Sequence, residues 1–203
     1  SLGIAAAPNA HGDPGRWPAG NGLRLLAVGR LSRYKGFDVL IDALATRSED
    51  RLLLIGAGEC EVQLRAQAQA RGLSARVAFA GDVDDASLAQ AYAGADAFVL
   101  PSRDRGEAFG LVLLEAMRAG LPVVASAIPG SGVTSVVVDG ETGVLVPPDD
   151  ASALAAVLAR FDDAGMRTRF GTAGRARWAE HYTLAHSADA TRRLYAAALG
   201  ASA

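Results

Sequence analysis

The sequence predicts an α/β fold with a doubly wound, parallel β-sheet of about six strands. Short and nearly continuous apolar runs alternate along the chain with segments in which apolar residues recur at helical spacing. The apolar runs lack the alternation of a half-exposed sheet, so helices should cover each strand on both faces. Strands and helices that alternate in this way form right-handed βαβ units, and such sheets bind ligands beyond the carboxyl ends of their strands.

Each expected element occupies a definite stretch of the chain. Strands are expected at residues 23–28, 52–55, 77–80, 97–100, 122–125 and 144–146. Helices are expected at residues 37–45, 59–71, 86–93, 110–117, 151–161, 166–181 and 184–199. Proline and glycine are frequent in residues 1–22, which are therefore predicted to form a linker. The chain thus divides into a linker at 1–22, an α/β domain at 23–183 and a C-terminal helix at 184–203.

The overall composition narrows the classes of protein to consider. With 203 residues, 50% of them hydrophobic, the chain can bury the core of one large domain. Its net charge of −2 argues against a nucleic-acid-binding protein, which would present a strongly basic face. Cys60 is the only cysteine, and no apolar run has the length or setting of a transmembrane helix or signal peptide. We therefore expect a soluble protein of the cytoplasm.

The segment at residues 101–120 carries the most informative pattern. A polar loop follows the strand at 97–100, and Gly110 then opens an apolar helix whose first backbone N–H groups form an anion site. Glu107 lies just before this helix and Glu115 lies within it. Because the helix is otherwise apolar, we expect it to be buried nearly all round, and a buried carboxylate needs a partner. A nucleotide would supply both a phosphate for the helix start and a hydroxyl for Glu115.

Each carboxylate also has a simpler interpretation. Glu107 could be a loop carboxylate that pairs with Arg103 or Arg105, an interaction of little energetic value if it is exposed. Glu115 could pair with Arg118, three residues further along the same helix. The expected burial of the helix favours a ligand for Glu115.

The loops after the first three strands contain further candidates. Gly29, Arg30 and Lys35 follow the first strand, where the two cations could hold a diphosphate or could simply be solvated. The G-x-G at residues 56–58 lacks the third glycine of the dinucleotide fingerprint, so a tight turn is the favoured interpretation. Residues 81–84 form either a helix cap, which is favoured, or the edge of a nucleobase slot.

The sequence offers no metal-binding or hydrolase pattern. His11, His181 and His186 lie far apart, without a cysteine or carboxylate cluster at ligand spacing, so we expect no metal site made of protein ligands alone. There is also no Ser-His-Asp or Cys-His arrangement and no isolated carboxylate pair of the hydrolase type.

Taken together, the motifs resemble the retaining GT-B glycosyltransferases of family 4. The run EAFGLVLLE at 107–115 matches the family signature E-x-F-G-x-x-x-x-E, and VGRLSRYKG at 28–36 is similar to its phosphate loop. LLIGAGE, RVAFAG, ADAFVLPS, EAMRAGLPVVAS and DGETGVLVPP follow in the family's order, and the resemblance covers about residues 23–200. It implies a Rossmann-like sheet that forms one half of a GT-B enzyme, with a C-terminal helix that crosses to the other half.

The resemblance also implies a role for each candidate residue. Glu107, Arg30 and Lys35 would be catalytic: the carboxylate would bind hydroxyls of the transferred sugar and the two cations would hold the diphosphate. Glu115 would bind the ribose hydroxyls. Backbone N–H groups of residues 109–112 would help to stabilise the negative charge of the leaving nucleoside diphosphate. The remaining residues implied to contact the donor are Phe109, Gly110, Leu111, Val112, Gly29 and Val83.

Partners follow from the same resemblance. The implied donor is a UDP-, GDP- or ADP-sugar, which is a substrate, and neither a cofactor nor a metal is expected. The implied acceptor is a glycan or a lipid-linked sugar, bound by an N-terminal domain that is absent from this chain. Residues 1–22 would be the remnant of the linker to that domain. The full-length enzyme would act at a membrane surface as a peripheral protein, and this chain alone would transfer little sugar.

One departure from the family pattern and two other functions are left open. Many members carry G-G-x-P-E where this chain has SGVTS at 131–135, so Ser135 stands in place of the family's glutamate and is not included in the site. A nicotinamide-dinucleotide-binding domain of an oxidoreductase is one alternative, although the incomplete G-x-G at 56–58 counts against it. A non-catalytic nucleotide-binding module is the other, although the four charged candidate residues count against it.

Overall fold

The computed structural model describes residues 17–198 and residue 200, so most of the predicted linker and the end of the predicted C-terminal helix lie outside the described residues. Its strands are β1 (Arg24–Val28), β2 (Arg51–Ile55), β3 (Val77–Phe79), β4 (Ala97–Leu100), β5 (Val123–Ser126) and β6 (Gly143–Val146). Its helices are α1 (Phe37–Ala45), α2 (Glu61–Ala70), α3 (Asp85–Gly94), α4 (Leu111–Arg118), α5 (Val133–Val136), α6 (Ala151–Arg160), α7 (Ala164–His181) and α8 (Leu184–Ala198), with a 3-10 turn, η1, at Arg33–Lys35. The expected strands and helices are present, whereas η1 and the short α5 were not predicted.

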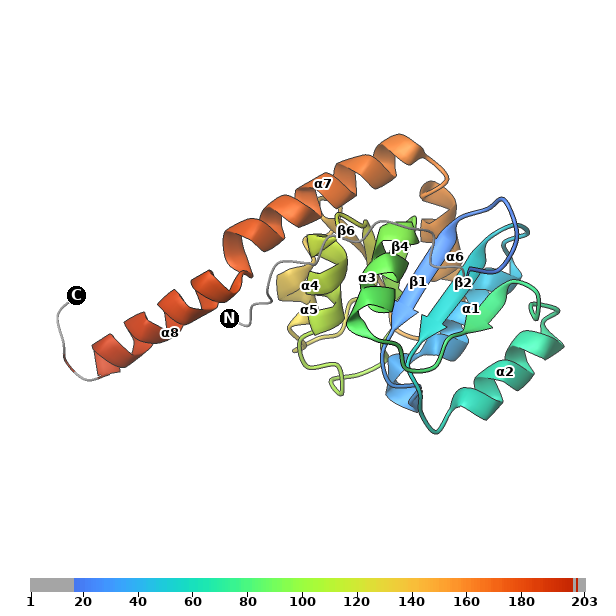
Figure 1. Ribbon diagram of the computed structural model, residues 1–203, viewed down its shortest axis with the longest axis horizontal. Helices are drawn as coiled ribbons and strands as arrows, with labels where there is room; N and C mark the ends of the chain where they lie inside the picture. Colours follow the sequence, from blue (N-terminus) through green and yellow to red (C-terminus); the bar gives the residue numbers. More distant parts are fainter. Residues whose placement is uncertain (1–16, 199, 201–203) are drawn as a thin grey trace.

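The six strands form one parallel sheet in the order β3-β2-β1-β4-β5-β6, which confirms the predicted doubly wound fold (Figure 1). The chain starts in the middle of the sheet and winds first toward β3 and then toward β6. The order therefore reverses between β1 and β4, which are neighbours. In open α/β sheets this reversal opens a crevice beyond the carboxyl ends of the two strands, and ligands bind there.

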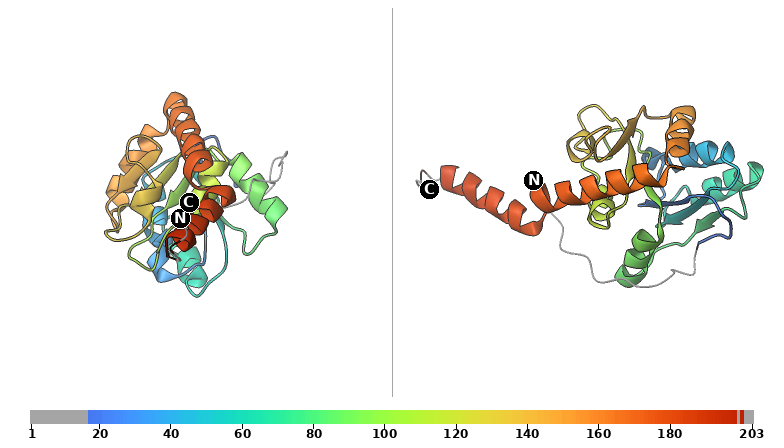
Figure 2. Two further views of the ribbon diagram at one scale, coloured as in Figure 1. Left: turned by 90° about the vertical axis from the view of Figure 1, so that its left-hand side faces the viewer. Right: turned by 90° about the horizontal axis from the view of Figure 1, so that it is seen from above.

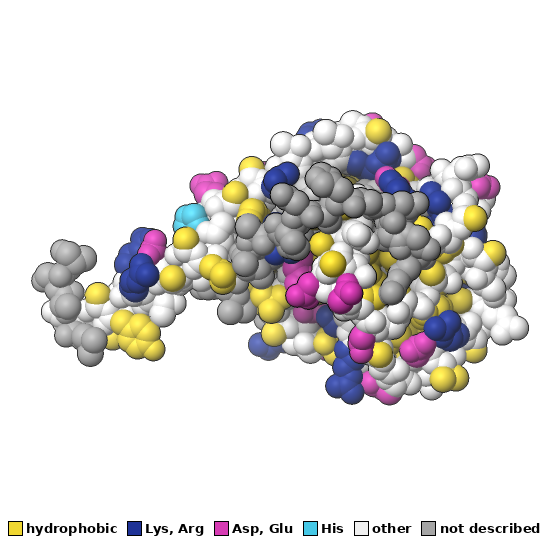
Figure 3. Space-filling model, in the orientation of Figure 1, with side chains coloured by type: hydrophobic (Ala, Val, Ile, Leu, Met, Phe, Trp, Pro, Cys, Tyr) yellow, Lys and Arg dark blue, Asp and Glu magenta, His cyan; other side chains and the backbone are white. Residues whose placement is uncertain are grey.

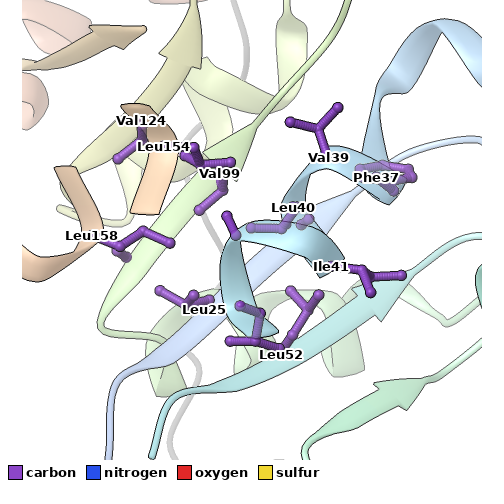
Figure 4. Packing of buried hydrophobic residues seen from close by; sticks show 14 of the residues in the cluster. Leu25, Phe37, Val39, Leu40, Ile41, Leu52, Val99, Val124, Leu154 and Leu158 are labelled. Atoms are coloured by element: carbon purple, nitrogen blue, oxygen red, sulfur yellow. The ribbon is translucent and has the colours of Figure 1, made fainter. Parts of the chain in front are cut away.

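Side chains of each strand alternate between two hydrophobic clusters, one on each face of the sheet. Leu25 and Ala27 of β1 join the cluster covered by α1, α2 and α6, and Leu26 and Val28 join the cluster covered by α3, α4 and α5. Figure 4 shows the first of these clusters, where side chains of α1 and α6 meet those of the strands. Burial on both faces explains why the strands read as continuous apolar runs.

The expectation that α4 is buried nearly all round is wrong. Its buried residues are Leu113, Leu114, Ala116 and Met117. A second stripe of the helix is open: Leu111 is 46% exposed, and Val112, Glu115 and Arg118 are partly exposed. The sheet covers only one side of α4, and an apolar side chain does not by itself imply a cover, since folded proteins expose many apolar atoms.

The C-terminal part of the structure projects away from the sheet. Helix α7 packs along α4 and β6, whereas α8 has no buried residue and extends beyond the domain (Figures 1 and 2). Leu184, Leu194 and Tyr195 of α8 are largely exposed, and hydrophobic and basic side chains lie together on this projecting helix (Figure 3). Within the described residues, none of the helices combines the length and the apolar character needed to cross a membrane.

Backbone segments at the carboxyl edge of the sheet approach one another very closely. A Cβ atom at Gly36 would lie 2.1 Å from the carbonyl oxygen of Pro101, and one at Gly56 would lie 2.1 Å from that of Gly29. Gly36 also has a φ of 66°, in the left-handed region. Glycine at these positions lets the loops after β1, β2 and β4 pack directly against one another.

A comparison of two glycine substitutions isolates the effect of this packing. Gly36→Ala and Gly72→Ala both place a side chain at a left-handed position, with φ of 66° and 71°, which costs about 1–2 kcal/mol. Only the Cβ at Gly36 would clash, with the carbonyl oxygen of Pro101. A Cβ at Gly72 would have no described atom within 4 Å. We expect Gly36→Ala to lower the free energy of unfolding by about 1–3 kcal/mol more than Gly72→Ala, measured by urea denaturation. Equal losses would show that the Gly36–Pro101 approach relaxes without cost.

Candidate functional site

The loops after β1, β2 and β3 line a common cavity of about 450 Å³ at the carboxyl edge of the sheet. Three of the predicted site residues, Gly29, Arg30 and Val83, contribute to it. The two interpretations of residues 81–84 are compatible: Asp84 caps α3 by accepting the backbone N–H of Ser87 at 2.7 Å, while Val83 lines the cavity. The cavity has a partly apolar wall and a cation at its edge, as a slot for a base next to phosphate requires.

Lys35 and Glu107 form a buried ion pair. The Nζ atom of Lys35 lies 2.6 Å from Oε2 of Glu107, and each residue is only 7% exposed. The side chain of Lys35 extends from η1 across Gly29 to reach this position. A Cβ atom at Gly29 would lie only 3.1 Å from Cε of Lys35, so the glycine leaves space for the lysine. The alternative in which Glu107 pairs with Arg103 or Arg105 is therefore wrong, because the carboxylate pairs across the β1–β4 crevice with the lysine.

Two serines that the sequence analysis did not single out support Glu107. The hydroxyl of Ser102 donates to the same carboxylate oxygen, Oε2, at 3.1 Å, and the hydroxyl of Ser131 donates to the backbone carbonyl of Glu107 at 2.5 Å. The loop that departs from the family pattern thus contacts the site through Ser131. Ser135 is exposed, and its carbonyl accepts from Arg177 and Tyr182, so its contacts are with the end of α7.

Arg103 attaches the turn that carries Lys35 to the loop after β4. Its backbone N–H donates to the carbonyl of Tyr34 at 2.7 Å, and its Nη1 donates to the carbonyl of Arg33 at 3.0 Å. The guanidinium also binds both carboxylate oxygens of Asp38, at 2.8 and 2.6 Å, and contacts Asp149. The hydrogen bond to Asp38 is the main reason why the pKa of Arg103 is raised. The bonds to the two carbonyls hold η1 against the loop after β4, and the bidentate contact with Asp38 holds the start of α1 against the same loop.

Arg30 differs from Lys35 because it is exposed. Its side chain is 73% exposed and forms an ion pair with Glu59, with 3.3 Å between Nη2 of Arg30 and Oε2 of Glu59. The pair lies at the surface, where such contacts contribute little to stability. Arg30 therefore stands at the edge of the cavity with a partner that an incoming anion can displace. The sequence analysis did not identify Glu59 as the partner of Arg30. The only signal for it in the sequence is its position in the loop after β2, directly behind residues 56–58.

The first backbone N–H groups of α4 are not capped by a side chain. Gly110 is the N-cap residue, with a φ of 77° and no side chain to accept a hydrogen bond. By contrast, α3, α6 and α7 each begin with an aspartate whose carboxylate accepts an N–H of the first turn. The N–H groups of Leu111 and Val112 have no intrahelical acceptor and carry the positive end of the helix dipole. This helix start suits an anion.

Phe109 contributes to the structure through its ring. The ring makes an edge-to-face contact with Tyr182, with 6.2 Å between centroids, and a Cβ at Gly132 would lie 2.7 Å from it. The side chain thus packs against the start of α5 and the end of α7, and the backbone of Phe109 is the part that leads into the start of α4.

Glu115 is partly exposed and accepts a hydrogen bond from the hydroxyl of Tyr92, with 2.8 Å to Oε2. Tyr92 lies on α3 and is 2% exposed, and the sequence analysis did not identify it. Burial is the main cause that raises the pKa of Tyr92, and the negative charge of Glu115 adds to it. The hydroxyl therefore remains a donor, and Glu115 has a protein partner as well as an open side.

Within residues 17–198 and 200, no group of three or more His, Cys, Asp or Glu side chains is arranged to hold a metal ion. Among the described residues, positive charge for a phosphate is offered by Arg30, Lys35 and the start of α4.

Comparison with known proteins assigns the chain to a family. The family described as glycosyl transferases group 1 matches residues 18–177, which cover β1 to β6 and the loops described above. The chain belongs to this family. Among the relatives of this chain, the phosphatidyl-myo-inositol mannosyltransferase of Mycobacterium leprae (strain TN) is 41% identical over 177 residues, which are 84% of this chain and 44% of that protein.

Solved structures agree with the family and with the fold. Sucrose-phosphate synthase from Thermosynechococcus elongatus superposes on this chain with a TM-score of 0.78 at 34% identity, covering 90% of this chain and 47% of that one. HepE from Anabaena, in complex with UDP, superposes with a TM-score of 0.77 at 27% identity, covering 87% of this chain and 49% of that one. The chain thus spans about half the length of the relatives that it matches.

The buried pair makes a testable prediction about stability. We expect Lys35→Met to lower the free energy of unfolding by about 3–5 kcal/mol, because Glu107 is then left buried without its cation. The double variant Lys35→Met/Glu107→Leu should regain most of this loss. Arg30→Met is the matched control, and it should change stability by no more than about 0.5 kcal/mol, since its pair with Glu59 is exposed. If both single variants lost the same small amount in urea denaturation, the pair would not be buried as described.

Proposed function

We propose that this chain is the donor-binding part of a retaining hexosyltransferase, which moves a sugar from a nucleoside-diphosphate sugar to a glycan or a lipid-linked acceptor. The observation that carries the proposal is the buried contact of Lys35 with Glu107 beside the open start of α4. It brings a cation, a carboxylate and N–H groups that lack an intrahelical acceptor to the crevice between β1 and β4. Together these groups suit a diphosphate joined to a sugar.

Each part of such a donor has a complementary group. The base would enter the cavity lined by Gly29 and Val83, and Glu115 would accept the ribose hydroxyls. The diphosphate would replace Glu107 as the partner of Lys35. It would likewise replace Glu59 as the partner of Arg30. Glu107, released from Lys35, would then accept hydroxyls of the sugar. HepE, which shares this fold, has been solved in complex with UDP, and this supports a nucleotide as the ligand that we propose.

The proposed chemistry needs stabilisation of negative charge more than a nucleophile from the protein. The bond between the anomeric carbon and a diphosphate oxygen breaks, and the acceptor oxygen bonds to the same carbon from the same face. The acceptor's proton passes to a diphosphate oxygen on that face. Lys35, Arg30 and the first N–H groups of α4 would stabilise the charge that develops on the leaving group. These groups could fill the place of a metal ion, so we propose a metal-independent reaction.

The proposal includes a second domain that binds the acceptor. Relatives such as the M. leprae mannosyltransferase are about twice as long as this chain. We propose that residues 23–183 form the donor-binding domain and that the helix from residue 184 onward packs against an N-terminal domain, which binds the acceptor. The exposed Leu184, Leu194 and Tyr195 of α8 offer an apolar surface for it. A lipid-linked acceptor lies at a membrane surface, so we propose that the full-length enzyme is a peripheral membrane protein.

Calorimetric titration in the presence of EDTA tests the donor site. We expect one of UDP, GDP and ADP to bind the wild-type chain more tightly than NAD does, since the loop at 56–58 lacks the dinucleotide pattern. Glu115→Gln should weaken the binding of that diphosphate about tenfold, because the ribose loses a charged acceptor. Glu141→Gln, which changes an exposed carboxylate in the turn before β6, is the control and should bind as the wild type does. Tighter binding of NAD would favour the oxidoreductase alternative and contradict the proposal.

The stereochemistry of the product tests the retaining mechanism and the catalytic nature of the site. In the full-length enzyme we expect the anomeric configuration of the product to equal that of the donor, as measured by the proton coupling of the anomeric carbon in NMR. An inverted product would overturn the retaining mechanism. Transfer should also fall by at least about 100-fold in Lys35→Met, through loss of leaving-group stabilisation. A full-length enzyme without any transferase activity would favour the non-catalytic module.

A further inference from the structure

Tyr92 connects the core of the domain to the open stripe of α4. Its ring lies in the cluster between α3, α4 and the sheet, tilted against Phe98 of β4 with 5.7 Å between centroids. Its hydroxyl reaches out of this cluster to Oε2 of Glu115 at 2.8 Å, with the carbonyl of Val112 as a second and longer contact at 3.5 Å. A buried ring thus ends in a bond to a carboxylate that is partly exposed.

Packing alone does not account for this hydroxyl. A phenylalanine would fill the same space in the core without a polar group to satisfy, and burying a hydroxyl is unfavourable unless it is bonded. Glu115 does not depend on the bond either, because its side of α4 is open enough for water to solvate a carboxylate. What the bond changes is the orientation of the carboxylate. The terminal torsion of a glutamate is otherwise broad, so an unattached carboxylate would rotate.

The chemistry of the two groups defines their roles in this bond, with Tyr92 as the donor and Glu115 as the acceptor. Burial and the negative charge of Glu115 both raise the pKa of Tyr92, so its hydroxyl keeps its proton and remains a donor. An ionised carboxylate has about four acceptor positions on two oxygens. With Oε2 occupied from the protein side, Oε1 is left with its lone pairs for a ligand on the open side.

We propose that Tyr92 is a positioning residue that orients Glu115, so that Oε1 accepts hydrogen bonds from the ribose hydroxyls of a nucleoside diphosphate. This inference rests on the proposed function, because it specifies how one carboxylate of the donor site acts. The vicinal 2′- and 3′-hydroxyls are two donors at a fixed separation, and an oriented carboxylate meets them with little loss of entropy on binding.

The test compares two ligands that differ only in these hydroxyls. The probes are the nucleoside diphosphate that binds in the titration above and its 2′,3′-dideoxy analogue. We expect Tyr92→Phe to weaken the binding of the nucleoside diphosphate about tenfold and the binding of the analogue less than twofold. In a Glu115→Gln background, Tyr92→Phe should cost less than twofold for either ligand, because the carboxylate that it orients is gone.

A matched control separates orientation from a general loss of packing. Tyr182→Phe removes the hydroxyl of another buried tyrosine, one that donates to the carbonyl of Ser135 at 2.9 Å, and it should leave both affinities unchanged. Equal losses for both ligands in Tyr92→Phe, or no loss for either, would overturn the role of Tyr92 and leave the proposed function intact. If the wild-type chain bound none of the three nucleoside diphosphates, the donor-site proposal would fail, and the role of Tyr92 would fail with it.

Discussion

The buried ion pair of Lys35 with Glu107 is the interaction on which the arrangement of the site depends. Removing two charges from water costs several kcal/mol for each ion, so the pair is tolerable only where its geometry is held closely. Here that geometry comes from backbone packing: Gly36 lies against Pro101, Gly29 gives space to the lysine, and Ser102 adds a second donor to Glu107. The loops after β1 and β4 are thus joined at the point where the strand order reverses.

The same pair determines which charges an approaching anion meets first. Without a donor, the charge of Lys35 is compensated by Glu107, whereas Arg30 stands exposed at the cavity with a solvated partner. The open start of α4 adds the partial charge of a helix dipole. An anion would therefore be attracted by Arg30 and α4 before it competes for Lys35. In the proposed function, Glu107 would therefore become free for a sugar only after the diphosphate has displaced it from Lys35.

The fold could be predicted from the sequence because its signals are local. Apolar runs mark strands covered on both faces, and helical periodicity marks the segments between them, so a doubly wound parallel sheet followed from general rules for βαβ units. The site was predictable only in its outline. The partner of Glu107 is 72 positions away in the chain, and nothing local to residue 107 distinguishes Lys35 from Arg103 or Arg105. Tyr92 and Ser131 were missed for the same reason, since their hydroxyls act across elements that only the tertiary structure brings together.

Helix α8 has a mechanical consequence for the crevice between β1 and β4. Because α8 buries none of its own residues, a load applied to it enters the domain where the chain passes from α7 to α8, at Tyr182. The ring of Tyr182 contacts Phe109, which directly precedes Gly110, the N-cap residue of α4. Phe109 and Glu107 belong to the same loop after β4. A projecting helix of fifteen residues therefore ends one ring contact away from the loop that carries Glu107.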